Sequence, residues 1–265
     1  MRILILGASS YAGQAIAKAL INKYEVYGTY YTQKINCLDE NKVFQMQLED
    51  TDSIKRILDH VQPQIIISSL RGDFQLQLGL HTIAADYLSP IKGGKLIFIS
   101  SSNVFDAAME KPHYESDKTN SQSDYGNFKI KCEQLLQDKL NERCVIVRIP
   151  QIYGKNSPTK NNTPIDTYPQ FYVNYTTDIQ IAEWISYIIK KDLGGVFHIG
   201  TKDTCDYMRF QLELSKILEL KEPVFQKEES LEKCFQAVIP GRTEIPDEMQ
   251  RSVTDVLEYL GRVQE

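Results

Sequence analysis

Residues 3–13 read Ile-Leu-Ile-Leu-Gly-Ala-Ser-Ser-Tyr-Ala-Gly, an apolar run that ends in a turn bounded by two glycines. The aliphatic run is typical of a strand that is buried on both faces. Gly7 and Gly13 allow the backbone to turn tightly and to approach a pyrophosphate at the N-terminus of the helix that follows. Ser10 stands where the G-x-x-G-x-x-G pattern has its middle glycine, and it is small enough to preserve the turn. The stretch predicts the first strand, turn and helix of a dinucleotide-binding fold.

Apolar runs and amphipathic segments alternate through the first half of the chain. Strands are expected at 3–6, 25–29, 43–46, 64–68, 95–100 and 145–149, and helices at 11–22, 51–60, 74–89 and 123–141. Strands that alternate with helices form βαβ units and a parallel sheet covered by helices. The predicted fold class is therefore α/β, with a Rossmann-type doubly wound parallel sheet.

The residue composition of the chain changes after Gly154. Residues 154–170 are rich in Pro, Asn, Ser and Thr, which predicts a long loop. A capping box at 177–180 precedes a helix to Lys190, followed by a strand at 195–199 and helices near 205–218 and 252–260. We expect residues 1–153 to form an NAD(P)-binding Rossmann core. Residues 154–265 should form a small α/β substrate lobe, interleaved with the core through the late strand.

Composition and charge exclude several classes of function. The 265 residues carry a formal net charge of −5 and contain no basic run, which argues against binding to nucleic acid or to an anionic membrane surface. No segment approaches the roughly 18 apolar residues of a membrane span. The five cysteines are scattered and show no metal-ligand spacing, so we expect reduced thiols, no metal and a cytoplasmic location.

A tyrosine and a lysine at helical spacing form the candidate catalytic pair. Tyr125 and Lys129 are separated by one helical turn and share a helix face. A nearby lysine cation lowers the pKa of a phenol, so that the tyrosine can exchange a proton while a nicotinamide exchanges hydride. Ser101 follows the strand at 95–100, 24 residues before Tyr125, and could donate a hydrogen bond to the substrate oxygen. Ser102 is the competing candidate for that role.

The segment after the second strand bears on the choice of cofactor. Enzymes that prefer NAD place an acidic residue there against the ribose hydroxyls, whereas residues 27–34 contain none. Lys34 could reach a 2′-phosphate, which favours NADP over NAD, although a solvated loop lysine is the alternative interpretation. Arg71 follows the fourth strand at the edge where ligands bind, and it could meet a substrate phosphate or simply lie on the surface.

Together these motifs resemble the extended short-chain dehydrogenases, most closely the dTDP-4-dehydrorhamnose reductase-like (RmlD-type) branch. The similarity extends over nearly the whole chain and includes Ile5–Gly7 with Gly13, Leu48–Glu49, Pro63–Ile67, Ile99–Asp106, Tyr125–Lys129, Val147–Gly154 and Val196–Gly200. The resemblance implies a Rossmann core, a nicotinamide cofactor and a small-molecule carbonyl substrate, commonly a nucleotide-linked 4-keto sugar. It also implies a homodimer, since the family's members are often dimers.

The resemblance assigns roles to individual residues. Ser101, Tyr125 and Lys129 would be the catalytic triad, Glu49 would lie near the adenine, Ser68 near the cofactor in place of the more usual Asn, and Pro150 beside the nicotinamide. The full set expected to bind the cofactor is Gly7, Ser9, Ser10, Tyr11, Gly13, Tyr30, Lys34, Glu49, Ser68, Ser69, Leu70 and Pro150. The set expected to bind substrate is Arg71, Ser102, Asn103 and Tyr153. His198 is expected in the core, and Arg148 is expected to be structural.

Departures from the family pattern leave the substrate open. Ser68–Leu70 replaces the usual Asn-Ala-Ala, and the segments from there to Lys95 and after Gly154 are short. An NADPH-dependent reductase is the leading interpretation. The alternatives are a sugar-nucleotide epimerase or dehydratase that retains NAD, and a regulatory protein that binds NADP without turnover.

Overall fold

The central sheet has the doubly wound order predicted from the sequence. In the computed structural model its strands are β1 (Arg2–Leu6), β2 (Glu25–Tyr30), β3 (Val43–Gln45), β4 (Ile65–Ser68), β5 (Lys95–Ser101), β6 (Cys144–Ile149) and β11 (Gly195–His198). They stand in the order β3-β2-β1-β4-β5-β6-β11, and the ladders that join β1 to β2 and β4, β2 to β3, and β4 to β5 are parallel. The winding reverses between β1 and β4, and sheets of this type bind ligands outside the carboxyl ends of the strands at that reversal.

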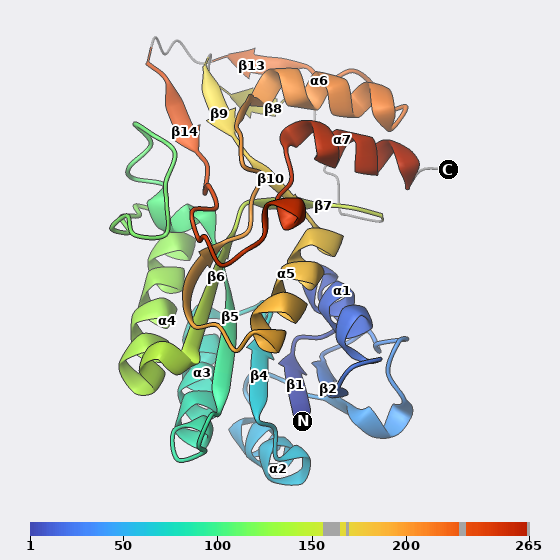
Figure 1. The fold of residues 1–265 in the computed structure, drawn as a ribbon, viewed down its shortest axis with the longest axis vertical. Helices are drawn as coiled ribbons and strands as arrows, with labels where there is room; N and C mark the ends of the chain where they lie inside the picture. Colours follow the sequence, from blue (N-terminus) through green and yellow to red (C-terminus); the bar gives the residue numbers. More distant parts are fainter. Residues whose placement is uncertain (156–164, 168–169, 228–231, 264–265) are drawn as a thin grey trace. The chain divides into compact units, whose positions relative to one another are not determined.

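Helices cover both faces of this sheet, as Figure 1 shows. They are α1 (Tyr11–Leu20), α2 (Thr51–Val61), α3 (Phe74–Leu88), α4 (Asp124–Leu140) and α5 (Asp178–Lys190). One face of the strands, including Leu4, Ile66 and Phe98, packs on α2, α3 and α4 in a single buried cluster. Because successive side chains alternate across a strand, Ile3 and Ile5 face the opposite side, and both are fully buried.

The structure describes residues 1–155, 165–167, 170–227 and 232–263, which form two compact units. The first unit comprises Met1–Ser100, Asn127–Val147 and Ile181–Phe197, and the second comprises Ser101–Gly126, Arg148–Gln180 and His198–Glu265. Residues 181–197 thus cluster with the sheet, whereas 101–126 cluster with the second unit. The units therefore do not coincide with the predicted ranges 1–153 and 154–265, because each is assembled from three separate segments.

Short strands and two helices build the second unit. Its pairs are β7 (Gln151–Tyr153) with β10 (Tyr175–Thr177), β9 (Phe171–Val173) with β12 (Cys205–Asp206) and β14 (Cys234–Gln236), and β8 (Ile165–Thr167) with β13 (Phe225–Lys227). The helices α6 (Tyr207–Ile217) and α7 (Val253–Arg262) enclose a core that contains Tyr153, Tyr175 and Phe210. Single-turn 3₁₀ helices lie at Glu40–Lys42, Ser102–Phe105, Asn141–Arg143 and Asp247–Met249.

Two local predictions need correction. The loop expected at 154–170 includes strand β8, while residues 156–164 and 168–169 lie outside the described residues. The capping box at the start of α5 is only half formed. The Thr177 hydroxyl accepts the Gln180 amide at 3.0 Å, but the Gln180 side chain contacts the Thr176 hydroxyl and the Gly200 carbonyl instead of returning to the Thr177 backbone.

The described helices include none with the length and apolar character that would let it cross a membrane. Cys132 and Cys144 are buried, and the other three cysteines are partly exposed; none of the five is paired in a disulfide.

Candidate functional site

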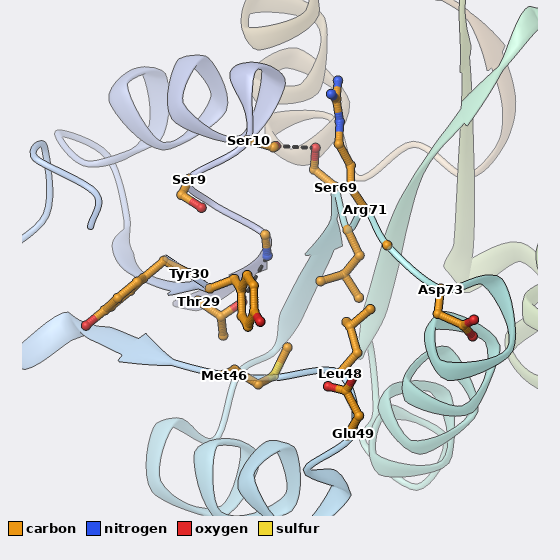
Figure 2. A pocket seen from close by; sticks show the side chains of 14 residues that line it. Ser9, Ser10, Thr29, Tyr30, Met46, Leu48, Glu49, Ser69, Arg71 and Asp73 are labelled. Atoms are coloured by element: carbon orange, nitrogen blue, oxygen red, sulfur yellow. Dashed lines mark hydrogen bonds between the residues drawn. The ribbon is translucent and has the colours of Figure 1, made fainter. Parts of the chain in front are cut away.

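A cavity of about 460 Å³ opens at the carboxyl ends of the first four strands (Figure 2). Its walls come from the segments directly after β1, β2, β3 and β4, which is where the strand order predicts a ligand. The residues that line it are Gly7, Ser9, Ser10, Thr29, Tyr30, Tyr31, Met46, Leu48, Glu49, Ser69, Leu70, Arg71, Gly72 and Asp73. All of them belong to the first unit.

The turn after β1 can be built only with glycine at position 7. Gly7 has a φ of +74°, and a Cβ there would lie 2.7 Å from the Ser69 carbonyl oxygen. Its amide donates to the buried Thr29 hydroxyl at 2.9 Å, and the Ala8 amide donates to the Thr29 carbonyl. The turn is therefore fixed between β2 and the segment after β4, which leaves its backbone close to the cavity.

Ser10 caps the helix in the place of the missing glycine. Its hydroxyl accepts the Gly13 amide at 3.0 Å and lies 2.7 Å from the Ser69 hydroxyl. A Cβ on Gly13 would approach the Gly7 carbonyl oxygen to 2.5 Å, so the helix begins directly against the turn. The serine preserves the turn as expected, and it also joins the glycine turn to the β4 segment.

The two ends of the cavity differ in chemistry, as Figure 2 shows. Tyr30, Met46 and Leu48 supply apolar walls at one end, where a planar base could lie. At the other end the Arg71 side chain extends in the direction of Ser10 and Ser69, beside the N-terminus of α1. An apolar slot that leads to a cation and a helix N-terminus fits the adenosine and pyrophosphate of a dinucleotide.

Eight of the predicted ligand-binding residues line this cavity, and several others do not. Ser68 is buried, and its hydroxyl lies 2.7 Å from Nε2 of His81. Lys34 lies in an exposed loop and forms an ion pair with Glu40 at 2.9 Å. Tyr11 and Gly13 lie on α1 but do not line the cavity, and Pro150 is a buried residue of the second unit.

Sequence reasoning missed six lining residues: Thr29, Tyr31, Met46, Leu48, Gly72 and Asp73. The alternation of apolar and polar residues after Val43 could have indicated Met46 and Leu48 as inward-facing. Asp73 has a structural role as well, because its carboxylate caps α3 by accepting the amides of Gln75 and Leu76 at 2.9 Å.

Lys129 lies in a buried environment in the first unit. Lys129 is only 6% exposed. Its Nζ donates to the Ile99 carbonyl at 2.9 Å and lies 4.6 Å from the centre of the Phe98 ring. Burial lowers the pKa of Lys129 to about 8. The group is therefore still mainly an ammonium ion at neutral pH, though much closer to its titration midpoint than an ordinary lysine.

The other predicted catalytic and substrate residues belong to the second unit. Ser101 is buried, and its hydroxyl donates to Asn103 Oδ1 at 3.0 Å and accepts the Asn103 amide at 3.2 Å. Ser102 is also buried. Tyr125 is 40% exposed in the first turn of α4, one turn before Lys129. Tyr153 is 1% exposed in the aromatic core, where its hydroxyl accepts a hydrogen bond from Gln211, so its location is that of a packing residue.

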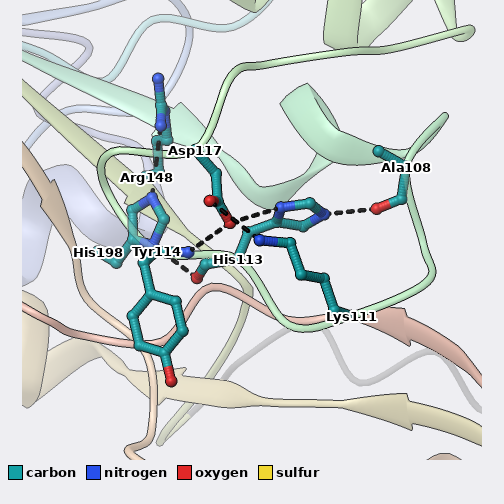
Figure 3. Close-up of polar contacts among 7 residues, drawn as sticks. All are labelled: Ala108, Lys111, His113, Tyr114, Asp117, Arg148 and His198. Atoms are coloured by element: carbon teal, nitrogen blue, oxygen red, sulfur yellow. Dashed lines mark hydrogen bonds and ion pairs between the residues drawn. The ribbon is translucent and has the colours of Figure 1, made fainter.

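The segment that links Ser101 to Tyr125 is organised by a buried histidine (Figure 3). Nδ1 of His113 lies 3.1 Å from the Asp117 carboxylate, and Nε2 faces the Ala108 carbonyl. The ring therefore bridges the Asp117 carboxylate and the Ala108 backbone within this segment. The ring stacks on Phe105 with centroids 4.0 Å apart.

His198 and Arg148 lie behind this segment in the second unit (Figure 3). His198 is fully buried, with Nδ1 3.2 Å from the His113 carbonyl oxygen and Nε2 3.5 Å from the Arg148 guanidinium. Burial, with a smaller contribution from the Arg148 cation, lowers the pKa of His198 to about 3. The neutral ring is a core histidine, as expected, and Arg148 packs over the Phe105 ring at 5.1 Å.

The doubly wound sheet and the cavity at its switch point define a dinucleotide-binding protein of the Rossmann type. Within that class, the chain belongs to the RmlD substrate-binding domain family, whose model matches residues 79–258. The resemblance to the RmlD-type branch of the extended short-chain dehydrogenases is thereby confirmed.

Individual relatives agree with this assignment. A dTDP-4-keto-6-deoxy-D-glucose reductase of Streptomyces niveus is 26% identical over 113 residues, and the match spans only 39% of either chain. The fold is similar to that of a dTDP-4-dehydrorhamnose reductase from Bacillus anthracis solved with NADP, with 18% identity, a TM-score of 0.76, and 99% and 98% of the two chains covered. It is also similar to a UDP-glucuronic acid 4-epimerase from Bacillus cereus solved with NAD, with 17% identity, a TM-score of 0.74 and full coverage of both chains. At these identities the structural matches establish the fold alone.

Proposed function

We propose that this chain is an NADPH-dependent reductase of a nucleotide-linked keto sugar. The observation that carries the proposal is the cavity at the carboxyl ends of β1–β4, with its apolar slot, helix N-terminus and Arg71, in a chain of the RmlD family. The Streptomyces relative is a dTDP-4-keto-6-deoxy-D-glucose reductase, which supports a dTDP-linked 4-keto-6-deoxy sugar as the substrate class.

Three side chains would carry the proton chemistry. A bound nicotinamide would supply the hydride. The Lys129 ammonium shares a face of α4 with Tyr125 and favours the phenolate that remains after proton donation. Tyr125 would give its proton to the carbonyl oxygen of the substrate, and the Ser101 hydroxyl would donate a hydrogen bond to the same oxygen.

Replacement of Tyr125 by Phe tests this assignment. We expect Tyr125→Phe to lower the turnover number at least about 100-fold, because the proton donor is lost, while NADPH affinity is retained. Turnover is measured by NADPH absorbance with a dTDP-linked 4-keto-6-deoxy sugar, and affinity by NADPH fluorescence. Tyr24→Phe, which removes a hydroxyl from a half-buried tyrosine in the first unit, should behave as wild type. A Tyr125→Phe enzyme of full activity would rule out the proposed chemistry.

The preference for NADP rests on Lys34. Residues 27–34 contain no carboxylate to repel a 2′-phosphate, and the Lys34–Glu40 ion pair is largely exposed, so its exchange for a phosphate costs little. We expect Lys34→Ala to weaken NADPH binding about tenfold, the effect of one lost phosphate contact, and to leave NADH binding unchanged. Lys42→Ala, which removes a similar ion pair from the same loop, is the control. Equal effects on the two cofactors would remove the argument for NADP.

The same assays separate the alternatives. An epimerase or dehydratase would convert the sugar nucleotide without net consumption of NADPH, and a regulatory protein would bind NADPH without consuming it. The cytoplasmic location and the homodimer stay predictions.

A further inference from the structure

A buried carboxylate lies one helical turn beyond Lys129. Glu133 on α4 is 3% exposed, and its Oε1 accepts a hydrogen bond from the buried Ser100 hydroxyl at 2.5 Å. Lys129 donates to the carbonyl of the neighbouring residue of β5, Ile99. Two adjacent turns of α4 therefore hold two adjacent residues of β5, immediately before Ser101 in the chain.

The charged and titratable groups around Lys129 show why the Glu133 carboxylate matters for the charge of that lysine. A buried ammonium ion is unstable unless an opposite charge compensates it. Besides Glu133, the groups that act electrostatically on or near Lys129 are Cys132 on α4, Arg71 after β4, and His81 on α3. Burial raises the pKa of Cys132 to about 12 and lowers that of His81 to about 3, so both are neutral near pH 7. Arg71 is a cation and disfavours the ammonium. Glu133 is the one anion in this set.

We propose that Glu133 is a positioning residue that keeps Lys129 protonated and holds it at the end of β5. The inference rests on the proposed function, because a protonated Lys129 matters only if it assists Tyr125. The Glu133 side chain is buried between α4 and β5 and accepts the hydrogen bond of Ser100. It therefore acts through Lys129 and does not contact substrate.

Direct titration of Lys129 tests the proposal without any need for turnover. Protein labelled with ¹³C-lysine is titrated by NMR, and the Lys129 ε-carbon signal is assigned by its loss in Lys129→Arg. We expect the midpoint of Lys129 to move to lower pH in Glu133→Gln, which keeps the shape and an acceptor for Ser100 but removes the charge. Asp138→Asn removes an equal charge from an exposed position of α4 and should leave the midpoint unchanged.

Activity adds a second readout that a merely structural role would not move. At pH 7 the turnover number of Glu133→Gln should fall about tenfold, with KM for NADPH unchanged, and it should recover towards that of wild type as the pH is lowered and Lys129 is reprotonated. Damage to packing would not be repaired by acid.

The outcomes separate the two proposals. An unchanged Lys129 midpoint in Glu133→Gln overturns this inference, whatever the activity. A shifted midpoint in a protein whose wild type consumes no NADPH with any dTDP-linked keto sugar overturns the reductase function and leaves the charge pairing intact. Glu133→Asp retains the charge at a greater distance and should give an intermediate midpoint. If the Gln variant does not fold, a wild-type midpoint in Glu133→Asp is the contradicting result.

Discussion

Gly7 is the residue on which the cavity depends most directly, and Gly93 provides its natural comparison. The two glycines have nearly identical φ angles, +74° and +73°, but a Cβ on Gly93 would meet nothing within 4 Å. Gly93→Ala should therefore lose only the roughly 1–2 kcal/mol of a left-handed conformation. Gly7→Ala should lose more, because its Cβ also collides with the Ser69 carbonyl, and it should abolish NADPH binding.

Urea unfolding and NADPH fluorescence titration measure both effects. If the two variants lost equal stability and both still bound NADPH, the close approach of the turn to the β4 segment would be irrelevant to the site. The backbone strain is the same in both variants, so the difference in stability between them measures the steric clash with the Ser69 carbonyl alone.

At the scale of elements, the segment between Ser101 and α4 depends on how Asp117 is held. Its carboxylate receives the buried His113 ring, the Tyr114 amide and the exposed Lys111 side chain. Burial alone would raise the pKa of Asp117, but these hydrogen bonds outweigh it and keep the pKa below its ordinary value. The buried His113 and the exposed Lys111 should therefore contribute very different amounts to the free energy of unfolding.

We expect His113→Gln to lower the free energy of unfolding by about 1–3 kcal/mol, because the partly buried acceptors on Asp117 and Ala108 lose the donors of the buried imidazole ring. Lys111→Ala should cost little, since exposed ion pairs contribute little to stability. Urea denaturation of both variants decides the point, and a Lys111→Ala loss as large as that of His113→Gln would contradict it.

Regular elements could be predicted from the sequence more readily than the side chains that meet between them. The strands β1, β4, β5 and β6 follow from apolar runs, whereas β7, β9 and β10 have three residues each and no periodicity to detect. Gly7 and Ser10 could be placed because they belong to a local motif. Thr29 and Asp73 could not, since their place in the cavity depends on contacts between segments far apart in the chain. Tyr153 follows a recognisable motif, yet the packing of β7 buries its side chain.

At the scale of the whole molecule, two buried neutral histidines should make the protein sensitive to acid. His81 in the first unit and His198 in the second have pKa values lowered to about 3, mainly by burial. The unfolded chain binds their protons near pH 6.5, so below that pH the unfolded state gains protons that the folded state excludes. Each histidine should therefore remove about 1.4 kcal/mol of stability per pH unit as the pH falls from 6.5 towards 3.

Urea unfolding at intervals between pH 7 and pH 4.5 tests this expectation above the range in which most carboxylates titrate. Removal of the exposed His60 in His60→Gln should leave the slope unchanged. A free energy of unfolding that stays level between pH 6.5 and 4.5 would show that neither histidine is held neutral by the fold.

The segmental composition of the two units has a consequence for biosynthesis. The chain passes between the units five times, the last time after Phe197. A nascent polypeptide released from the ribosome only as far as residue 153 would possess β1–β6 but lack β11, the outer strand beside β6, and the α5 helix. Neither unit is complete until translation has passed residue 198. The emerging chain must therefore carry an unfinished sheet until β11 has been made, and the β6 edge stays uncovered while residues 150–198 are synthesised.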